Sequence, residues 1–210
     1  FNMVEQQIRP WQVLDTQVLN VLSHVQRELF VPQAYQALAY ADTEIPLGHG
    51  ETMLPPRVDA RLMHDLQLTG SEKVLHIGTG SGYLAALLAG RAQRVVSLEI
   101  NPELASNARN NLQRAGISHV DVRVADGSQG AAADGPFDAI LLNGSVAQVP
   151  TALLQQLKVG GRLVAIVGDE PMMRATVVTR NSDNTFTTTE PWDCNAPRLN
   201  GFTEPSRFAF

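Results

Sequence analysis

The sequence predicts an α/β fold in which a mostly parallel sheet carries helices on both faces. Two observations on residues 73–167 support this prediction. Short apolar runs alternate there with segments of helical periodicity, which is the order that strand–helix–strand crossovers produce. The runs are also continuous in valine, isoleucine and leucine, as in strands that are covered on both faces. We therefore predict a doubly wound sheet with its ligand crevice at the carboxyl ends of the strands.

The expected elements follow one another along the chain. Two amphipathic helices come first, one over residues 13–25 and one through Val58, Leu62, Met63 and Leu66. Residues 41–57 between them form an ordered loop, because it holds Ile45, Leu47, Met53 and Leu54, which favour burial. Strands are expected over 73–77, 94–100, 119–124, 137–142 and 161–167, and helices over 83–89, 102–115 and 150–157. An antiparallel hairpin is expected last, over 175–180 and 186–192, with 206–210 as a final strand piece.

The composition excludes several functional classes. The 210 residues are 44% hydrophobic and 18% charged, which suits one domain with a real core. A net charge of -5 without a cluster of Lys and Arg argues against a nucleic-acid partner. No apolar run approaches eighteen residues and no signal peptide is expected, so we expect no membrane partner. Cys194 is the only cysteine, which favours a reducing, cytoplasmic compartment. His24, His64 and His119 lack the spacing of metal ligands, so no metal is expected.

A glycine-rich turn is the strongest functional pattern. Gly78, Gly80 and Gly82 follow the first sheet strand at G-x-G-x-G spacing, directly before a predicted helix. Glycine lets the backbone approach a ligand closely, and the helix N-terminus points unpaired N–H groups into the crevice. Glu99 ends the next strand, where a carboxylate can accept both hydroxyls of a ribose. Tyr83 stands where a dinucleotide fingerprint has its third glycine, so a nucleoside without a pyrophosphate is favoured over NAD. The alternative is a tight turn beside a solvated strand-end acid.

Two further strand ends carry polar residues. Asp126-Gly127 follows the third strand, where the carboxylate can accept from an exocyclic adenine amine and the glycine leaves room for the ring. Asp-Gly is also a common turn dipeptide. Asn143-Gly144-Ser145 closes the fourth strand, where its polar groups either face a cofactor or substrate or cap a turn. The sequence leaves both pairs of alternatives open.

These residues resemble class I methyltransferases, and nearly the whole chain resembles the protein-L-isoaspartate O-methyltransferase family. The shared stretches include the N-terminal helices and the Gly48–Pro56 loop, which are peculiar to that family. They are Met3-Val4-Glu5-Gln6-Gln7-Ile8, Phe30-Val31-Pro32, Ala39-Tyr40-Ala41-Asp42, Ile45-Pro46-Leu47-Gly48, Gly50-Glu51-Thr52, Ile77-Gly78-Thr79-Gly80-Ser81-Gly82-Tyr83, Gln156-Leu157-Lys158-Val159-Gly160-Gly161-Arg162-Leu163 and Pro205-Ser206-Arg207-Phe208. Pro136-Phe137-Asp138-Ala139-Ile140 resembles class I methyltransferases more generally.

The resemblance implies a fold, a cofactor and an activity. The fold would be a Rossmann-like, mostly parallel, seven-stranded methyltransferase sheet in one domain. Residues 1–70 would supply the N-terminal helices and the substrate loop, and 71–210 the cofactor-binding sheet. The cofactor would be S-adenosylmethionine, and the partner an isoaspartyl-containing protein or peptide whose free α-carboxylate is methylated to start its repair; we expect a monomer. The implied cofactor-binding residues are His76, Gly78, Thr79, Gly80, Ser81, Gly82, Tyr83, Glu99, Ile100, Asp126, Gly127 and Asn143.

The loop that would hold the substrate carboxylate departs from the family pattern. The family has roughly Gly-Gln-Thr-Ile-Ser-x-Pro there, with the serine as the active-site residue. This chain has Gly50-Glu51-Thr52-Met53-Leu54-Pro55-Pro56, so Thr52 and Leu54 occupy the catalytic positions. Thr52 matches, whereas Leu54 cannot donate a hydrogen bond, and one lost donor to a buried charge costs about 1–3 kcal/mol. Thr52, His49 or Ser145 could compensate.

A second departure is His76, which stands two residues before the first glycine of the turn. The family usually has an acid there, which helps to hold the amino end of the cofactor. A neutral histidine could accept one hydrogen bond but brings no negative charge. The alternative is a strand histidine that is satisfied by a neighbour.

Three functional hypotheses remain open at this stage. The first is an isoaspartyl methyltransferase with a variant loop. The second is a related methyltransferase that acts on another carboxylate or a small molecule. The third is a non-catalytic protein that binds the cofactor or a partner. The resemblance over the whole length favours the first, whereas Leu54 and His76 favour the other two.

Overall fold

The computed structural model describes residues 1–206, and a seven-stranded sheet forms its centre. The strand order is β5-β4-β3-β6-β7-β8-β9, and the first five of these strands run parallel. Chain order runs outward from β3 to β5 and then returns to the other side of β3, so the switch point lies between β3 and β6. The strands are β3 (Lys73–Ile77), β4 (Arg94–Glu99), β5 (Val120–Val124), β6 (Phe137–Val146), β7 (Leu157–Asp169), β8 (Met172–Arg180) and β9 (Phe186–Asp193).

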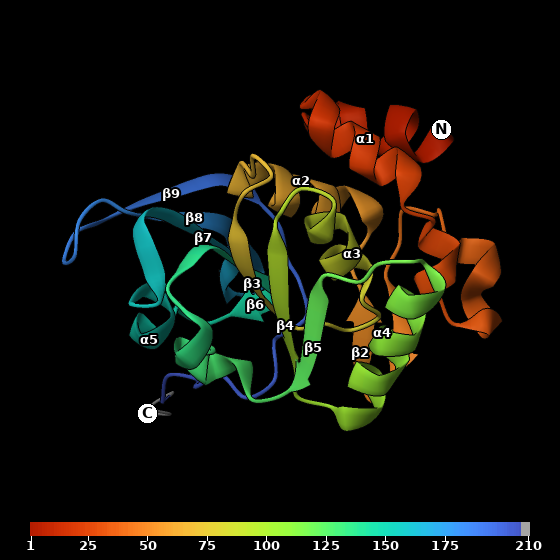
Figure 1. Ribbon diagram of the computed structural model, residues 1–210. Helices are drawn as coiled ribbons and strands as arrows, with labels where there is room; N and C mark the ends of the chain where they lie inside the picture. The colour runs from red at the N-terminus through yellow and green to blue at the C-terminus, as the bar shows by residue number, and fades with distance from the viewer. Residues whose placement is uncertain (207–210) are drawn as a thin grey trace.

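Helices cover both faces of this sheet, but unequally (Figure 1). On one face, α1 (Thr16–His24), α2 (Pro56–Leu66), α3 (Tyr83–Ala89) and α4 (Pro102–Arg114) bury a large apolar cluster. On the other face, a smaller cluster packs under α5 (Thr151–Leu154). Short helical turns complete the chain: Val4–Ile8, Arg9–Trp11, Arg27–Phe30, Gln33–Leu38, Gly127–Gln129 and Ala132–Asp134. Among the helices of residues 1–206, none has the length and apolarity that a membrane span requires.

The loop predicted over 41–57 contains a small antiparallel hairpin. Its strands are β1 (Ile45–Gly48) and β2 (Glu51–Met53). Gly48, His49 and Gly50 at its tip have φ values of 84°, 55° and 74°, which explains the two glycines. Ile45, Met53 and Leu54 are buried, as the sequence predicts.

Most predicted elements are confirmed, but several boundaries differ. The helix predicted over 150–157 ends at Leu154, because Leu157 already pairs with Phe137 at the start of β7. Strand β6 does not close at Asn143 but continues to Val146, and its register with β7 shifts between Leu141 and Ser145. The strand piece predicted over 206–210 lies outside the described residues apart from Ser206.

Candidate active site

The glycine turn after β3 has the backbone that its sequence predicts. Gly78, Gly80 and Gly82 have φ values of 93°, 54° and 90°, a region that other residues rarely adopt. Gly82 is the N-cap of α3, so the turn leads directly into the helix. The Gly78 N–H donates to the Leu98 carbonyl of β4 at 2.9 Å, which fixes the turn against the neighbouring strand.

Glu99 lies at the end of β4 and is connected to this turn. Its side chain is 5% exposed. Oε1 accepts from the Gly80 N–H and Oε2 accepts from the Asn101 N–H, each at 2.9 Å. Each carboxylate oxygen can accept a second hydrogen bond, so Glu99 retains acceptors for two hydroxyl groups. The structure therefore excludes the alternative of a solvated strand-end acid.

A small cavity of about 30 Å³ lies in front of Glu99 and joins the glycine turn to the substrate loop. Seven of the implied cofactor-binding residues line it together with both implied catalytic residues. These nine residues are Gly78, Thr79, Gly80, Ser81, Tyr83, Glu99, Asn143, Thr52 and Leu54. The Asn143 Oδ1 and the Thr52 Oγ1 are buried and have no hydrogen-bond partner within the described structure. Unpaired buried acceptors and donors of this kind indicate a place for a polar ligand.

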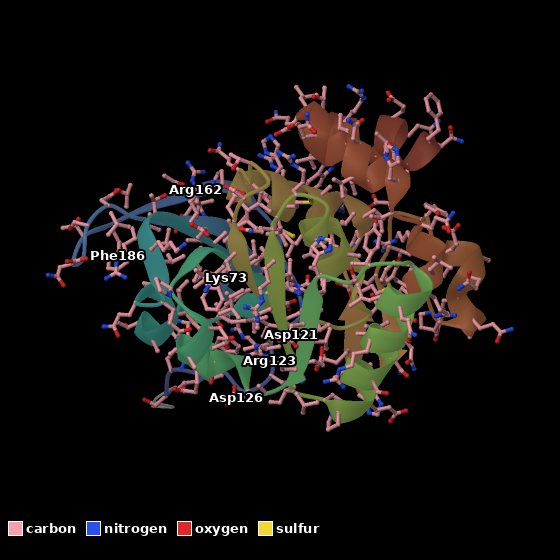
Figure 2. All side chains as sticks on the ribbon, in the orientation of Figure 1. Lys73, Asp121, Arg123, Asp126, Arg162 and Phe186 are labelled. Carbon is pink, nitrogen blue, oxygen red and sulfur yellow. The ribbon has the colours of Figure 1, made fainter. Side chains whose placement is uncertain are left out.

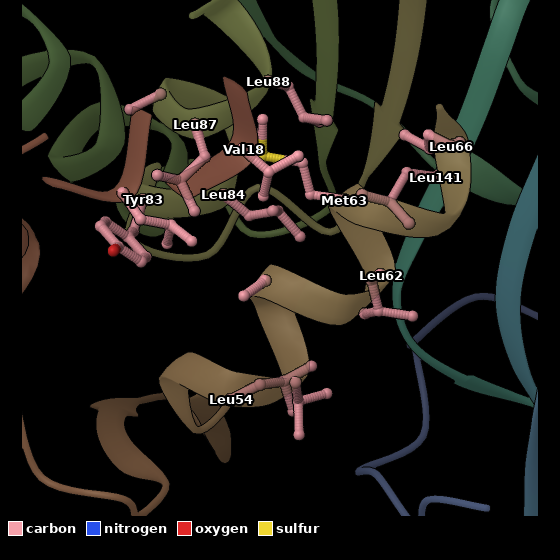
Figure 3. Close-up of a cluster of buried hydrophobic side chains, with 14 of the residues drawn as sticks. Val18, Leu54, Leu62, Met63, Leu66, Tyr83, Leu84, Leu87, Leu88 and Leu141 are labelled. Atoms are coloured by element: carbon pink, nitrogen blue, oxygen red, sulfur yellow. The ribbon is translucent and has the colours of Figure 1, made fainter. Parts of the chain in front are cut away.

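Of the three residues that could compensate for Leu54, only Thr52 lines the cavity. Leu54 is 4% exposed, so its apolar side chain contributes to the cavity wall and to the core (Figure 3). His49 pairs instead with Glu103 of α4, at 3.0 Å between Nε2 and Oε2. The hydroxyl of Ser145 accepts from Arg198 at 3.3 Å, away from the cavity. Thr52 is therefore the hydroxyl that the loop offers.

His76 lies behind the cavity rather than on its wall, which corrects the predicted cofactor contact. The side chain is fully buried, and Nδ1 hydrogen-bonds with the Ser97 Oγ at 2.8 Å. Ser97 in turn hydrogen-bonds with the Thr79 Oγ1 at 2.6 Å, so His76 reaches the cavity only through two hydroxyls. Burial lowers the pKa of His76 to about 3 and keeps the ring neutral. The alternative of a strand histidine satisfied by a neighbour holds for Nδ1 alone, because the buried Nε2 has no hydrogen-bond partner within the described structure.

The depressed pKa of His76 predicts an acid-sensitive contribution to stability. The unfolded-state pKa of His76 is about 6.5, so below that pH the imidazole is protonated in the unfolded chain but stays neutral in the folded protein. The stability is fully present above pH 6.5 and is lost as the pH falls toward 3, at up to about 1.4 kcal/mol per pH unit. We expect His76→Leu to remove this slope. Urea unfolding of both proteins at pH 7, 6 and 5 checks it; parallel pH curves would contradict the burial of a neutral ring.

Four other implied cofactor residues lie outside the cavity. Gly82 packs against α4, where an added Cβ would lie 3.4 Å from Ala108 Cβ. Ile100 is 41% exposed. Asp126 accepts from the Ser128 N–H at 3.0 Å, so it caps the turn that follows β5, and Figure 2 shows it at the lower edge of the sheet. A Cβ at Gly127 would clash with Ile77, so the absence of a side chain at this position permits close packing on β3.

A buried polar cluster beside the cavity was missed by sequence reasoning. Arg27 is 0% exposed, its Nε donates to the Ala39 carbonyl at 2.6 Å, and its Nη2 donates to the Leu54 carbonyl at 3.1 Å. Its Nη1 lies 3.8 Å from Asp59 Oδ2, and the guanidinium carbon lies 4.6 Å from the centroid of the Tyr83 ring. Burial, partly offset by Arg27, raises the pKa of Asp59 to about 7. Arg27 therefore connects the substrate loop to the first residue of α3.

The sheet order, the glycine turn and the strand-end acid together define the class I methyltransferase fold. The family model for protein-L-isoaspartate(D-aspartate) O-methyltransferase (PCMT) matches residues 2–195. The chain belongs to this family.

Individual relatives agree with this assignment. The chain is 45% identical to a protein-L-isoaspartate O-methyltransferase of Methanoculleus marisnigri over 166 residues, which are 79% of this chain and 76% of that one. It is 45% identical to protein-L-isoaspartate O-methyltransferase 2 of Marinobacter nauticus, over 88% of this chain and 84% of that one. A Plasmodium falciparum protein assigned to the same enzymes and crystallised with S-adenosyl-L-homocysteine has the same fold, with a TM-score of 0.80, 21% identity and coverage of 95% and 97%.

Proposed function

We propose that this protein transfers the methyl group of S-adenosylmethionine to the α-carboxylate of L-isoaspartyl residues, the first step in repairing damaged proteins. The observation that carries the proposal is Glu99, a buried carboxylate fixed by the Gly80 N–H and still able to accept from two ribose hydroxyls. Membership of the family supports the choice of donor and acceptor. In this arrangement residues 1–70 supply the substrate loop and 71–210 the cofactor sheet. The expectation of a monomer stays a prediction.

The polar groups of the cavity fit this cofactor. Glu99 would hold the ribose, and the unpaired Oδ1 of Asn143 would accept from the amino end of the cofactor. Asp126 would lie toward the adenine, since it stands at the end of β5, next to the strand that ends in Glu99. When bound, the cofactor supplies a methyl sulfonium, which is a reactive methyl donor.

The protein's own residues have a limited task in such a reaction. An α-carboxylate has a pKa near 3.5 and is ionised at pH 7, so no general base is needed. The hydroxyl of Thr52, which is unpaired and lines the cavity, would donate to that carboxylate and orient it. Leu47 and Leu54 line the same cavity and exclude water from it. Positioning and desolvation, rather than proton transfer, are therefore the contributions we assign to this site.

The direct test is transfer of labelled methyl to an isoaspartyl peptide, with the ordinary aspartyl peptide as the control. We expect label on the isoaspartyl peptide alone. Label on other small carboxylates but not on this peptide would favour a methyltransferase with a different acceptor. Calorimetry with S-adenosylmethionine tests the hypothesis of a non-catalytic protein. Binding of the cofactor without methyl transfer to any acceptor would support that hypothesis.

Restoring the missing hydroxyl is expected to raise this activity. Leu54 lines the cavity beside Thr52, so the hydroxyl in Leu54→Ser can provide a second donor to the substrate carboxylate. One hydrogen bond to a charged group gives about 1.5–3 kcal/mol, so we expect kcat/KM to rise at least tenfold. Leu54→Ala is the matched control, because it removes the same apolar contacts without adding a hydroxyl. Equal activity of the two variants would mean that this position does not face the carboxylate.

A further inference from the structure

The segment that follows β9 returns to the sheet and crosses the carboxyl ends of its central strands. The Ser145 N–H of β6 donates to the Pro197 carbonyl at 2.8 Å, and the Leu199 N–H donates to the Ser145 carbonyl at 2.8 Å. In Figure 1 this dark blue chain descends from β9 to the lower edge of the sheet, where Figure 2 places Asp126. We call residues 197–202 the gate segment.

Leu199 of the gate segment fills the space in front of the glycine turn. A Cβ at Gly78 would lie 2.8 Å from Leu199 Cδ2, and a Cβ at Gly144 would lie 2.9 Å from Leu199 Cγ. The cavity that Leu199 lines with Glu99 measures only about 30 Å³. Sites for ligands of this size measure roughly 300–1,000 Å³. The polar groups of the site fit the cofactor, but its volume does not while Leu199 stays in place.

Neighbouring residues of the gate segment contact other parts of the same site. A Cβ at Gly201 would lie 2.7 Å from Asp126 Oδ1 and 3.3 Å from Ile100 Cδ1. The Asn200 side-chain amide donates to the carboxylate of Glu51 in the substrate loop. The gate segment therefore spans from the proposed adenine end of the site to the loop that would hold the substrate.

Arg198 holds the near end of the gate segment. Its Nη1 donates to the Gly168 carbonyl at 2.7 Å, and its Nη2 lies 2.6 Å from Asp169 Oδ1. Leu199 and Phe202, by contrast, are only partly buried against the smaller apolar cluster. Gly201 has a φ of 88°, a conformation that glycine adopts without strain. Arg198 also pairs with Glu204, at 2.6 Å between Nε and Oε1. Between these two residues the segment is held by the Leu199 N–H bond to Ser145, the Asn200–Glu51 hydrogen bond and the apolar contacts of Leu199 and Phe202.

We propose that residues 199–202 move about the Arg198 anchor to admit the cofactor and then close over it. Leu199 is the steric stop of this gate, and the Asn200–Glu51 hydrogen bond couples its closed position to the substrate loop. The identity of the cofactor rests on the function proposed above. A gate that opens in only a small fraction of molecules lowers the apparent association rate by that fraction.

The test is the kinetics of S-adenosylhomocysteine binding to the full-length Leu199→Ala variant, followed by stopped-flow fluorescence. Truncating Leu199 removes apolar contact that holds the gate closed, so we expect association and dissociation rates both to rise about tenfold. Leu154→Ala is the matched control, because Leu154 packs on the same apolar cluster but lies on α5. Its rates should equal those of the wild type.

Several outcomes would overturn the gate. Unchanged rates in Leu199→Ala would show that Leu199 does not limit entry, and faster dissociation alone would make Leu199 a fixed wall of the site. Should the variant fold poorly, hydrogen exchange on the wild type decides: amides of 199–202 must exchange more slowly with S-adenosylhomocysteine bound. If the wild type methylates isoaspartyl peptide, but Leu199→Ala does not change the binding rates and the cofactor product does not slow hydrogen exchange at 199–202, only the gate is refuted. Wild-type protein that binds no cofactor refutes both proposals.

Discussion

Replacing Glu99 with glutamine is expected to weaken S-adenosylmethionine binding about a hundredfold. The Glu99 carboxylate accepts from the Gly80 and Asn101 N–H groups on separate oxygens. A glutamine has only one oxygen, so its NH₂ group must face one of these two donors. The charge that strengthens hydrogen bonds from the ribose hydroxyls also disappears. Two charge-assisted hydrogen bonds at about 1.5 kcal/mol each correspond to roughly a hundredfold in Kd.

Isothermal calorimetry on folded protein measures this effect, with thermal unfolding as the check on folding. Glu103→Gln is the matched control: its carboxylate is 68% exposed and pairs with His49 rather than facing the cavity. That variant should bind the cofactor as the wild type does. A Kd for Glu99→Gln within threefold of the wild-type value would remove Glu99 from the cofactor site and with it the observation that carries the proposed function.

The sheet was predictable from the sequence because its determinants are local. Doubly covered strands are continuous apolar runs, and Asn101 before Pro102 gives the start of α4, where the asparagine side chain accepts from the Glu103 and Leu104 N–H groups. The end of α5 was not predictable in this way. It depends on the pairing of Leu157 with Phe137, which lies twenty positions earlier in the chain. The sequence around either residue does not indicate this pairing.

The site was predictable in its positions more than in its contacts. Glycines with positive φ and an acid at a strand end have sequence signatures, and the structure brings Gly78, Gly80 and Glu99 together. Gly127 and His76 also lie close to the carboxyl ends of their strands, yet Gly127 packs against Ile77 and His76 hydrogen-bonds with Ser97. Leu199 carries no signature at all, because its place follows from how the C-terminal segment returns to the sheet.

The burial of Arg27 is the feature of the site that was hardest to predict from the sequence. Arginine is rarely fully buried, so its default placement is the surface. The one available clue was its position three residues before Phe30-Val31-Pro32, a stretch shared with the family. In the structure this arginine is fully buried and donates to carbonyls of two separate segments.

Replacing Arg27 with methionine is expected to lower the free energy of unfolding by about 3–5 kcal/mol. Methionine retains the apolar volume, but Asp59 loses the countercharge 3.8 Å away, and the Ala39 and Leu54 carbonyls lose their donor. Urea unfolding at pH 8 measures the loss. Because Leu54 is one of the released groups, we also expect KM for the isoaspartyl peptide to rise more than kcat falls.

The pH dependence distinguishes a lost charge pair from a lost packing contact. Folded Asp59 has a pKa of about 7, above its unfolded value near 3.8, so stability falls as the pH rises through that interval. Without Arg27 the folded pKa rises further, and the loss continues to higher pH. The gap between wild type and Arg27→Met should therefore widen from pH 5 to pH 8. Adding Asp59→Leu should recover at least half of the loss at pH 8, because no unpaired carboxylate remains. A gap that is equal at both pH values, and not reduced by the second substitution, would mean that Arg27 stabilises the fold by packing alone.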